Sequence, residues 1–136
     1  MFYGCTNLTS FNSDLPSLTN GSNMFGGCTN LTSFSGDLSA LTSGSSMFNS
    51  CTNLTSFNSD LPSLTNGSYM FNSCKLNLES VQKIANTIND LTAVNKTGSI
   101  YISMDKTLKS DDTAAPVNVA LAAIRAKGWT VSENYK

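Results

Sequence analysis

The sequence predicts an α/β fold: a stack of repeated coils joined by a parallel β-sheet, followed by a C-terminal cap of helix, strand, helix and strand. The first observation is a 23-residue unit at residues 1–23, 24–46 and 47–69, whose first and third copies are identical at 20 of 23 positions. The second is a change after residue 76 from the fixed repeat pattern to helical apolar spacing. We therefore expect a repeat array over residues 1–76, ending in a partial unit at 70–76, and a cap over residues 77–136.

Apolar residues recur at six positions of the unit, so each position forms a column through stacked coils. Neighbouring strands of a sheet lie about 4.8 Å apart, which lets like residues of successive coils pack on one another. Thr9–Asn12 and Asn23–Phe25 are the expected strands, separated by turns at Asp14-Leu15-Pro16 and Asn20-Gly21. The columns are Met1, Met24, Met47 and Met70; Phe2, Phe25, Phe48 and Phe71; Leu8, Leu31 and Leu54; Phe11, Phe34 and Phe57; Leu15, Leu38 and Leu61; and Leu18, Leu41 and Leu64.

The cap begins with a helix expected over residues 78–91, because Asn77 can cap its start and five apolar residues fall on one face: Leu78, Val81, Ile84, Ile88 and Leu91. Ser99–Ser103 alternates as a strand does. Pro116 opens and Gly128 closes a second helix, and Trp129–Val131 forms a last strand. A strand–helix–strand crossover of this kind is right-handed. We expect it to continue the parallel sheet of the array while the helices cover the end of the stack.

The repeat pattern C-x2-L-x2-F, with a later L-P and a closing M-F at a period of 23, resembles the BspA-type leucine-rich repeats of bacterial surface proteins and some phage tail proteins. The resemblance covers residues 1–74 and implies a right-handed leucine-rich-repeat solenoid. The segment KGWTV, ending at Val131, resembles the C-terminal segment that often closes such arrays. By this resemblance the protein belongs at a bacterial cell surface, outside the cell, or in a virion tail.

Charge and composition exclude several classes of function. The net charge is −1 and only 12% of residues are charged, so neither a nucleic-acid footprint nor a polybasic membrane patch is present, and no apolar run is long enough to insert into a membrane. All eight basic residues lie from Lys75 onward. The chain contains no histidine, and no serine has an evident base partner, so we expect no enzyme, no catalytic residue and no cofactor.

Three polar columns allow alternative interpretations. Cys5, Cys28, Cys51 and Cys74 are expected to be free buried thiols, with disulfides and a zinc site as alternatives, although a line of sulfurs does not suit tetrahedral zinc. Asp14, Asp37 and Asp60 could gather a calcium ion, but repeated Asx-turns are the favoured interpretation, and no metal site is assigned. Asn7, Asn30 and Asn53 are interpreted as an asparagine ladder that satisfies coil backbone, with exposure to a ligand as the alternative.

The candidate ligand-binding residues lie on the outside of the predicted coils. If Phe11, Phe34 and Phe57 point inward, their neighbours point outward and form a neutral surface that we call the polar strip. Two tyrosines, Tyr3 and Tyr69, join the candidate site because other copies of the unit carry small or polar residues at those positions. The polar strip consists of Ser10, Asn12, Ser33, Ser35, Ser56 and Asn58.

The leading hypothesis is a non-enzymatic extracellular binding or adhesion module that presents this neutral surface to a glycan or a protein. The alternative is a structural spacer or assembly segment of a larger surface or phage tail protein. Ice binding by the columns of Thr9, Thr32 and Thr55 and of Thr19, Thr42 and Thr65 is a remote third hypothesis. Since Met1 opens directly into a repeat, we also expect the first unit to be uncapped and to favour self-association.

Overall fold

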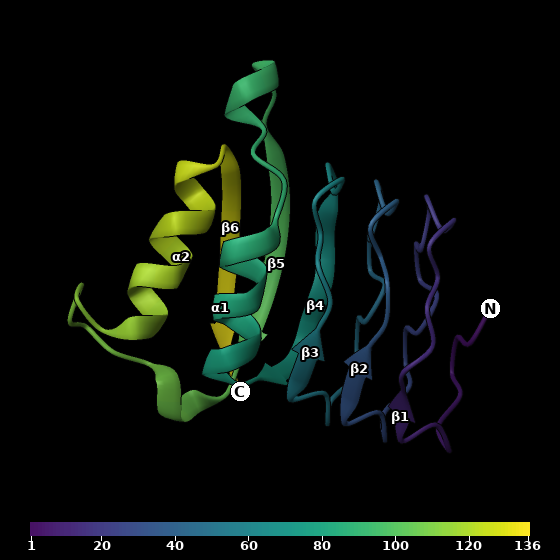
Figure 1. Cartoon of the computed structure of the whole chain (residues 1–136). Coiled ribbons are helices and arrows are strands. Elements are labelled where there is room, and N and C mark those ends of the chain that lie inside the picture. The colour runs from purple at the N-terminus through teal and green to yellow at the C-terminus, as the bar shows by residue number, and fades with distance from the viewer.

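A computed structural model describes the whole chain, residues 1–136, as an α/β fold with parallel strands in two sheets (Figure 1). The first sheet has the order β1-β2-β3 and the second the order β4-β5-β6. In Figure 1 the repeat units stand side by side from the N-terminus towards the two helices, which lie in front of the second sheet. The elements are β1 (Ser10–Phe11), β2 (Ser33–Ser35), β3 (Ser56–Asn58), β4 (Gly67–Leu76), α1 (Leu78–Thr87), η1 (Thr92–Val94), β5 (Gly98–Met104), η2 (Lys106–Leu108), α2 (Pro116–Ala126) and β6 (Trp129–Tyr135).

The first sheet pairs the repeats in the register that the 23-residue period predicts. Ser10 is opposite Ser33 and Ser33 is opposite Ser56, and the phenylalanines that follow are paired in the same way. The backbone of adjacent coils is also bonded beyond the short strands, as where Thr32 N–H donates to Thr9 O over 2.8 Å. The expected strand at Thr9–Asn12 is therefore confirmed, although it is shorter than predicted.

The expected strand at Asn23–Phe25 is wrong, because these residues form a turn. Asn23 has a φ of +57° and Ser46, at the same position of the next unit, has +55°, a left-handed conformation that is common in turns. Adjacent coils remain bonded here all the same, since Phe25 N–H donates to Met47 O over 2.9 Å. Only the corresponding residues where the third unit meets the fourth, Tyr69, Met70 and Phe71, lie in a strand, β4.

The core of the stack consists of two phenylalanine columns packed against each other. Rings within each column are stacked, with centroids 5.5 Å apart for Phe25 and Phe48 and 5.4 Å apart for Phe11 and Phe34. Rings of different columns meet edge to face, as Phe34 and Phe48 do at 4.9 Å. No buried polar side-chain atom lacks a hydrogen-bond partner. The predicted apolar columns are thus confirmed as the interior of the stack.

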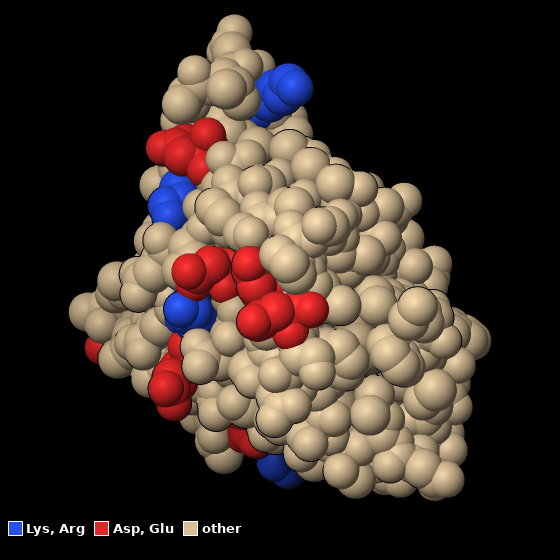
Figure 2. Space-filling model, turned by 45° about the vertical axis from the view of Figure 1, so that its right-hand side comes forward, with Lys and Arg blue, Asp and Glu red and all other residues tan.

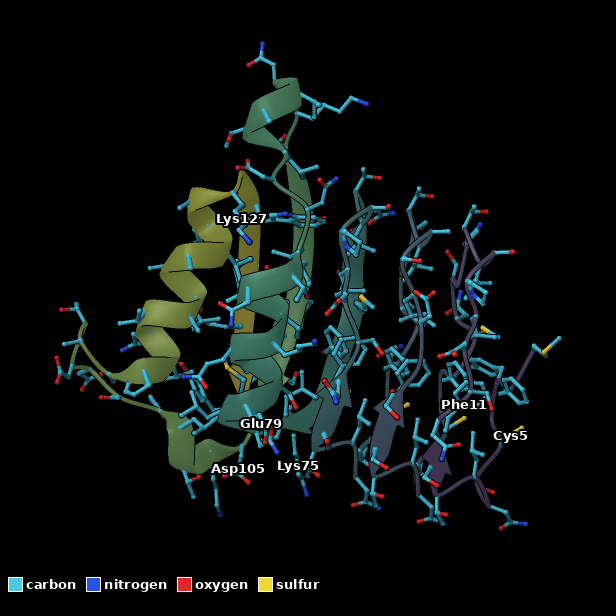
Figure 3. All side chains as sticks on the ribbon, viewed as in Figure 1. Cys5, Phe11, Lys75, Glu79, Asp105 and Lys127 are labelled. Atoms are coloured by element: carbon cyan, nitrogen blue, oxygen red, sulfur yellow. The ribbon has the colours of Figure 1, made fainter.

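The first coil is less buried than its copies. Leu8 and Phe11 are half-buried, whereas Leu31 and Phe34 at the same unit positions are 0% and 1% exposed. Figure 3 shows Cys5 and Phe11 near the N-terminal end of the stack. The expected self-association through this coil stays a prediction.

Helix α1 begins where the sequence predicts and ends earlier. Asn77 caps it by accepting a hydrogen bond from Ser80 N–H over 2.9 Å. It ends at Thr87 instead of residue 91, since Asn89 turns back to the third coil. There its N–H donates to Leu61 O over 3.0 Å and its amide Nδ2 to Leu64 O over 3.2 Å. The predicted end is wrong because bonds to the array replace a further helical turn.

The cap continues only one of the two walls of the stack. Strand β5 pairs in parallel with β4, and β6 pairs in parallel with β5, but neither joins the sheet of β1, β2 and β3. Beside β3 lies the start of α1, where Ser80 Oγ accepts a hydrogen bond from Phe57 N–H over 2.8 Å. The expectation of one continuous sheet is therefore wrong, because a helix start occupies the place of a fourth strand.

The remaining cap elements agree with the sequence prediction. Helix α2 has Pro116 in its first turn and buries Val117, Leu121 and Ile124. Gly128 follows it with a φ of +86°. Strand β6 starts at Trp129 as expected but extends to Tyr135, since all seven of its residues pair with β5. Neither helix has the length and apolar character needed to span a bilayer.

The cysteine column is buried except at its first member. All four cysteines are free thiols, and Cys28, Cys51 and Cys74 each lie 0% exposed with Sγ donating to a carbonyl of the preceding coil. Burial raises the pKa of Cys28, raises that of Cys51 to about 12, and raises that of Cys74 well above its usual value. The reactive thiolate is therefore suppressed at three of the four positions.

We expect a thiol reagent at neutral pH to label one cysteine of the native protein rapidly, Cys5, and all four after denaturation without reductant. Cys5 is exposed, whereas the other three need local opening of a coil before they react. In the control variant Cys5→Ser the rapid native phase should disappear. A denatured count of two or zero free thiols would contradict this arrangement. Mass spectrometry of the labelled peptides makes the assignment.

Candidate ligand-binding site

The polar strip lies on the outer face of the first sheet. Its residues flank the inward phenylalanines: Ser10, Asn12 and Asn58 are exposed, and Ser33, Ser35 and Ser56 are half-buried. Their side chains make no hydrogen bond within the protein. By contrast, Thr32 Oγ1 in the neighbouring column donates to Thr9 O over 2.9 Å. The hydrogen-bond donors and acceptors of the polar strip are therefore available to solvent or to a ligand.

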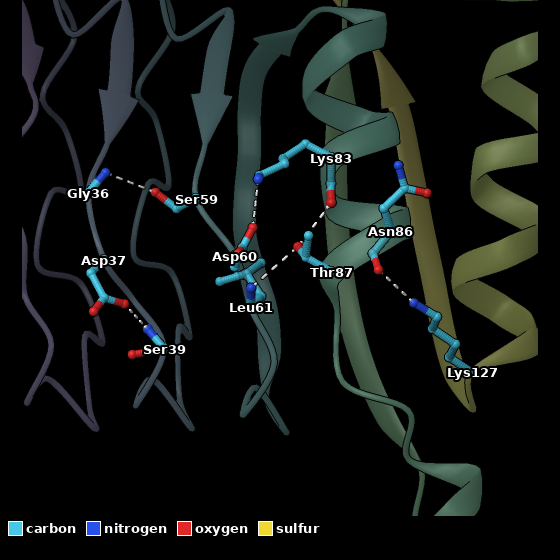
Figure 4. A network of polar contacts seen from close by, with 10 residues as sticks. All are labelled: Gly36, Asp37, Ser39, Ser59, Asp60, Leu61, Lys83, Asn86, Thr87 and Lys127. Atoms are coloured by element: carbon cyan, nitrogen blue, oxygen red, sulfur yellow. Dashed lines mark hydrogen bonds and ion pairs between the residues drawn. The ribbon is translucent and has the colours of Figure 1, made fainter.

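At its C-terminal end the polar strip meets helix α1. A hollow lies between β3 and α1, and it is lined mainly by polar side chains: Ser56, Phe57, Asn58, Glu79, Ser80, Gln82, Lys83 and Asn86. Lys83 Nζ lies 2.6 Å from Asp60 Oδ1, as Figure 4 shows. The cap thus places charged groups beside the last coil of an otherwise neutral strip.

The aspartate column is held by protein partners. Asp37 Oδ1 accepts from Ser39 N–H over 2.7 Å in an Asx-turn, and the hydrogen bonds to Ser39 lower the pKa of Asp37 (Figure 4). Asp14 Oδ1 accepts from Asp37 N–H over 2.9 Å, and Asp60 pairs with Lys83. The Asx-turn interpretation is confirmed for Asp37, while the other two carboxylates bind neighbouring coils or the cap. No group of three or more Cys, Asp or Glu side chains is arranged to hold a metal ion.

The asparagine and threonine columns bond the coils to one another. Asn30 Nδ2 donates to Thr6 O over 2.7 Å and Asn53 Nδ2 to Thr29 O over 2.8 Å, which confirms the asparagine ladder. The hydroxyls of Thr32, Thr42, Thr55 and Thr65 all donate to carbonyls of the preceding coil. Their protons are therefore committed to the protein, which argues against an ice-binding role for these columns.

The predicted tyrosines lie outside the polar strip. Tyr3 is 71% exposed and rests across Gly26, where an added Cβ would lie 3.0 Å from its ring. Tyr69 is 58% exposed and stacks on Tyr101 with ring centroids 5.8 Å apart and planes at 15°. We call Tyr69 and Tyr101 the tyrosine pair. A shallow hollow beside it is lined by Ser68, Tyr69, Ser99, Ile100, Tyr101 and Ser132.

The structure does not bring the polar strip and the tyrosines together. Phe11 on one wall of the coil and Phe25 on the other point inward and meet at 4.9 Å. The polar strip flanks Phe11 and its copies in the first sheet, whereas Tyr69 and Tyr101 lie on β4 and β5 of the second sheet and Tyr3 follows Phe2, which belongs to the same column as Phe25. The predicted site is in fact two separate surfaces.

Several polar residues beside Tyr69 were not predicted as site residues. Ser68 Oγ and Ser99 Oγ lie 2.7 Å apart, and Ser132 is opposite Tyr101 in the pairing of β5 and β6. Ser68 occupies the same unit position as Ser22 and Ser45, and this serine column could have indicated it as a candidate site residue from the sequence. The positions of Ser99 and Ser132 depend on how β5 and β6 join β4, and the sequence alone does not give that order.

Comparison with known proteins identifies one family. Residues 1–97 match a family model described as the BspA type leucine rich repeat region, in six copies. The match covers more than half of the chain and extends beyond the expected array into the region of α1 and η1. Comparisons with curated proteins and with solved structures gave no match.

Proposed function

Since the chain belongs to the BspA-type leucine-rich repeat family, we propose that it is a non-enzymatic binding module of a bacterial surface protein or a phage tail. Repeats of this type are typical of bacterial surfaces, and leucine-rich repeats generally mediate protein interactions and are generally not catalytic. The proposed ligand is a protein or a glycan, held on the outside of a right-handed solenoid formed by residues 1–76. The proposed role of residues 77–136 is to cap that solenoid.

The observation that carries this proposal is the polar strip with its unused hydrogen-bonding groups. Side chains of the asparagine and threonine columns donate hydrogen bonds to the adjacent coil, whereas side chains of the polar strip make no hydrogen bond within the protein. The 23-residue register places its serines directly opposite one another, so that the same group recurs from coil to coil. A surface of this kind can bind an extended ligand through several weak, equivalent contacts.

The charge distribution limits the chemistry of the ligand. The first 74 residues contain no Lys or Arg and only three Asp. In Figure 2 the charged atoms gather on part of the visible face, and the broad remainder is uncharged. Without fixed charge, neither a polyanion nor a polycation gains electrostatic attraction from the array. A neutral ligand rich in hydrogen-bonding groups suits it best.

Screening the intact chain on glycan and protein arrays tests the proposal. We expect at least one reproducible ligand, whose binding the substitution Ser33→Glu weakens by placing a charge in the middle of the polar strip. The matched control is Ser17→Glu, which adds the same charge away from the strip at an exposed serine without a side-chain hydrogen bond, and should leave binding unchanged. Absence of any ligand on both arrays would favour the alternative, a spacer in a larger surface or tail protein. Equal loss in both variants would contradict a role for the polar strip.

A further inference from the structure

Tyr69 has a backbone conformation that its side chain disfavours. Its φ is +55°, in the left-handed region, where Asn and Gly are tolerated and a bulky aromatic residue is an outlier. The same unit position holds Asn23 and Ser46, with φ of +57° and +55°. The coil therefore sets this conformation, and a small polar residue would satisfy it with less strain.

Burial does not compensate for this strain. The Tyr69 ring is 58% exposed and lies outside the phenylalanine core. Its observed partner is Tyr101 on β5, half-buried and nearly parallel to it. Two aromatic rings are thus displayed where the last repeat meets the cap. Cross-strand stacking stabilises a sheet modestly, but it does not require the ring to occupy a left-handed position.

Hydroxyl groups surround the tyrosine pair, and charged groups do not. Ser68 and Ser99 bond to each other through their Oγ atoms, Ser132 lies opposite Tyr101, and the hollow they line measures about 240 Å³. None of the residues that line it is charged. It is smaller than the roughly 300–1,000 Å³ of pockets that enclose a drug-sized molecule. A single small ring, open to solvent on one side, fits these dimensions.

These features match the chemistry of a neutral sugar. A pyranose ring has apolar C–H faces that pack on aromatic rings, and its hydroxyl groups both donate and accept hydrogen bonds, as the serines here do. A protein interface of standard size instead buries about 800 Å² on each partner, with an apolar centre inside a polar rim. Around the tyrosine pair the surface is serine-rich, so the exposed apolar area is limited to the two rings.

We propose that Tyr69 and Tyr101 form a stacking platform for one ring of a neutral saccharide, with Ser68, Ser99 and Ser132 binding its hydroxyl groups. This inference rests on the proposed binding function and assigns it a ligand class and a second surface. The site lies on the second sheet and the polar strip on the first, so it acts independently of that strip.

The test is titration of the intact chain with a panel of neutral hexasaccharides of glucose, mannose, galactose and N-acetylglucosamine, followed by tyrosine fluorescence and NMR. We expect at least one to bind below about 10 mM, and Tyr101→Ala to weaken that binding about tenfold. Tyr69→Asn should weaken it equally while keeping or raising the melting temperature, because Asn23 already occupies this conformation in the first unit. Tyr69→Phe should retain binding, since stacking needs only the ring.

The control is Val119→Ala, which removes another exposed apolar side chain, on α2, and should leave saccharide binding unchanged. Unaltered binding in Tyr69→Asn would overturn the platform. No saccharide binding by the wild type, together with a ligand on the protein array, would overturn the saccharide inference and leave the proposed function intact. Loss of every ligand on both arrays would reject both.

Discussion

Replacement of Phe34 by alanine is expected to lower the free energy of unfolding by about 3–5 kcal/mol. Phe34 is 1% exposed, stacks on Phe11 and Phe57 in its own column, and meets Phe25 and Phe48 edge to face. Truncation therefore leaves a cavity in the middle of the stack, between two coils whose backbone bonds resist collapse. Urea denaturation followed by circular dichroism measures the change.

Its neighbour provides the matched control. Ser33 precedes Phe34 in β2 and points outward without a side-chain hydrogen bond, so Ser33→Ala should change the free energy of unfolding by less than about 0.5 kcal/mol. Similar small effects in both variants would mean that the inward and outward faces of the coil are assigned wrongly. A large effect from Ser33→Ala alone would lead to the same conclusion.

Replacement of Gly98 by alanine is expected to cost about 1–3 kcal/mol, because an added methyl group overpacks the junction of array and cap. A Cβ at Gly98 would lie 2.7 Å from Leu91 Cδ1, 2.8 Å from Trp129 Cζ3 and 2.9 Å from the Thr65 carbonyl oxygen. The last of these is backbone and cannot rotate away. The shift of the indole ring should also change tryptophan fluorescence, which reports this site directly because Trp129 is the only tryptophan.

Gly26→Ala is the control for this substitution. An added Cβ there would lie 3.0 Å from the ring of Tyr3, an exposed side chain that can move. Its melting temperature should remain close to that of the wild type. If Gly98→Ala proved equally mild, the contact between β5 and the third coil would be looser than the structure shows.

The sequence predicts the interior of this protein better than its chain path. A strict period of 23 aligns Phe11, Phe34 and Phe57 whatever the shape of the coil, so the apolar columns could be inferred directly. The conformation of Asn23 could not, since the left-handed turn there occurs together with hydrogen bonds between coils, such as that from Asn23 N–H to Ser45 O, which depend on how the coils stack. The end of α1 was missed for a similar reason: bonds from Asn89 to the third coil override an apolar pattern that favours helix.

The candidate sites differ in the same way. Outward residues of the polar strip follow from alternation around an inward phenylalanine, which is local information. The tyrosine pair depends on the pairing of β4 with β5, two strands separated in sequence by α1. Tyr101 could be recognised from the sequence as an aromatic residue outside the repeated columns. Its contact with Tyr69 could not be predicted without the fold.

The constant register between coils also makes the length of the molecule adjustable in whole steps. Each unit forms the same backbone and side-chain hydrogen bonds with the next unit as with the previous one. For example, Thr32 donates from its N–H and hydroxyl to Thr9 O, and Thr55 donates in the same way to Thr32 O. A duplicated or deleted block of 23 residues would therefore leave its neighbours chemically matched at the new boundary. Such an event would change the reach of the protein by about 4.8 Å and add or remove one row of the polar strip. Gene duplication within the array can thus tune reach and avidity together without a new fold.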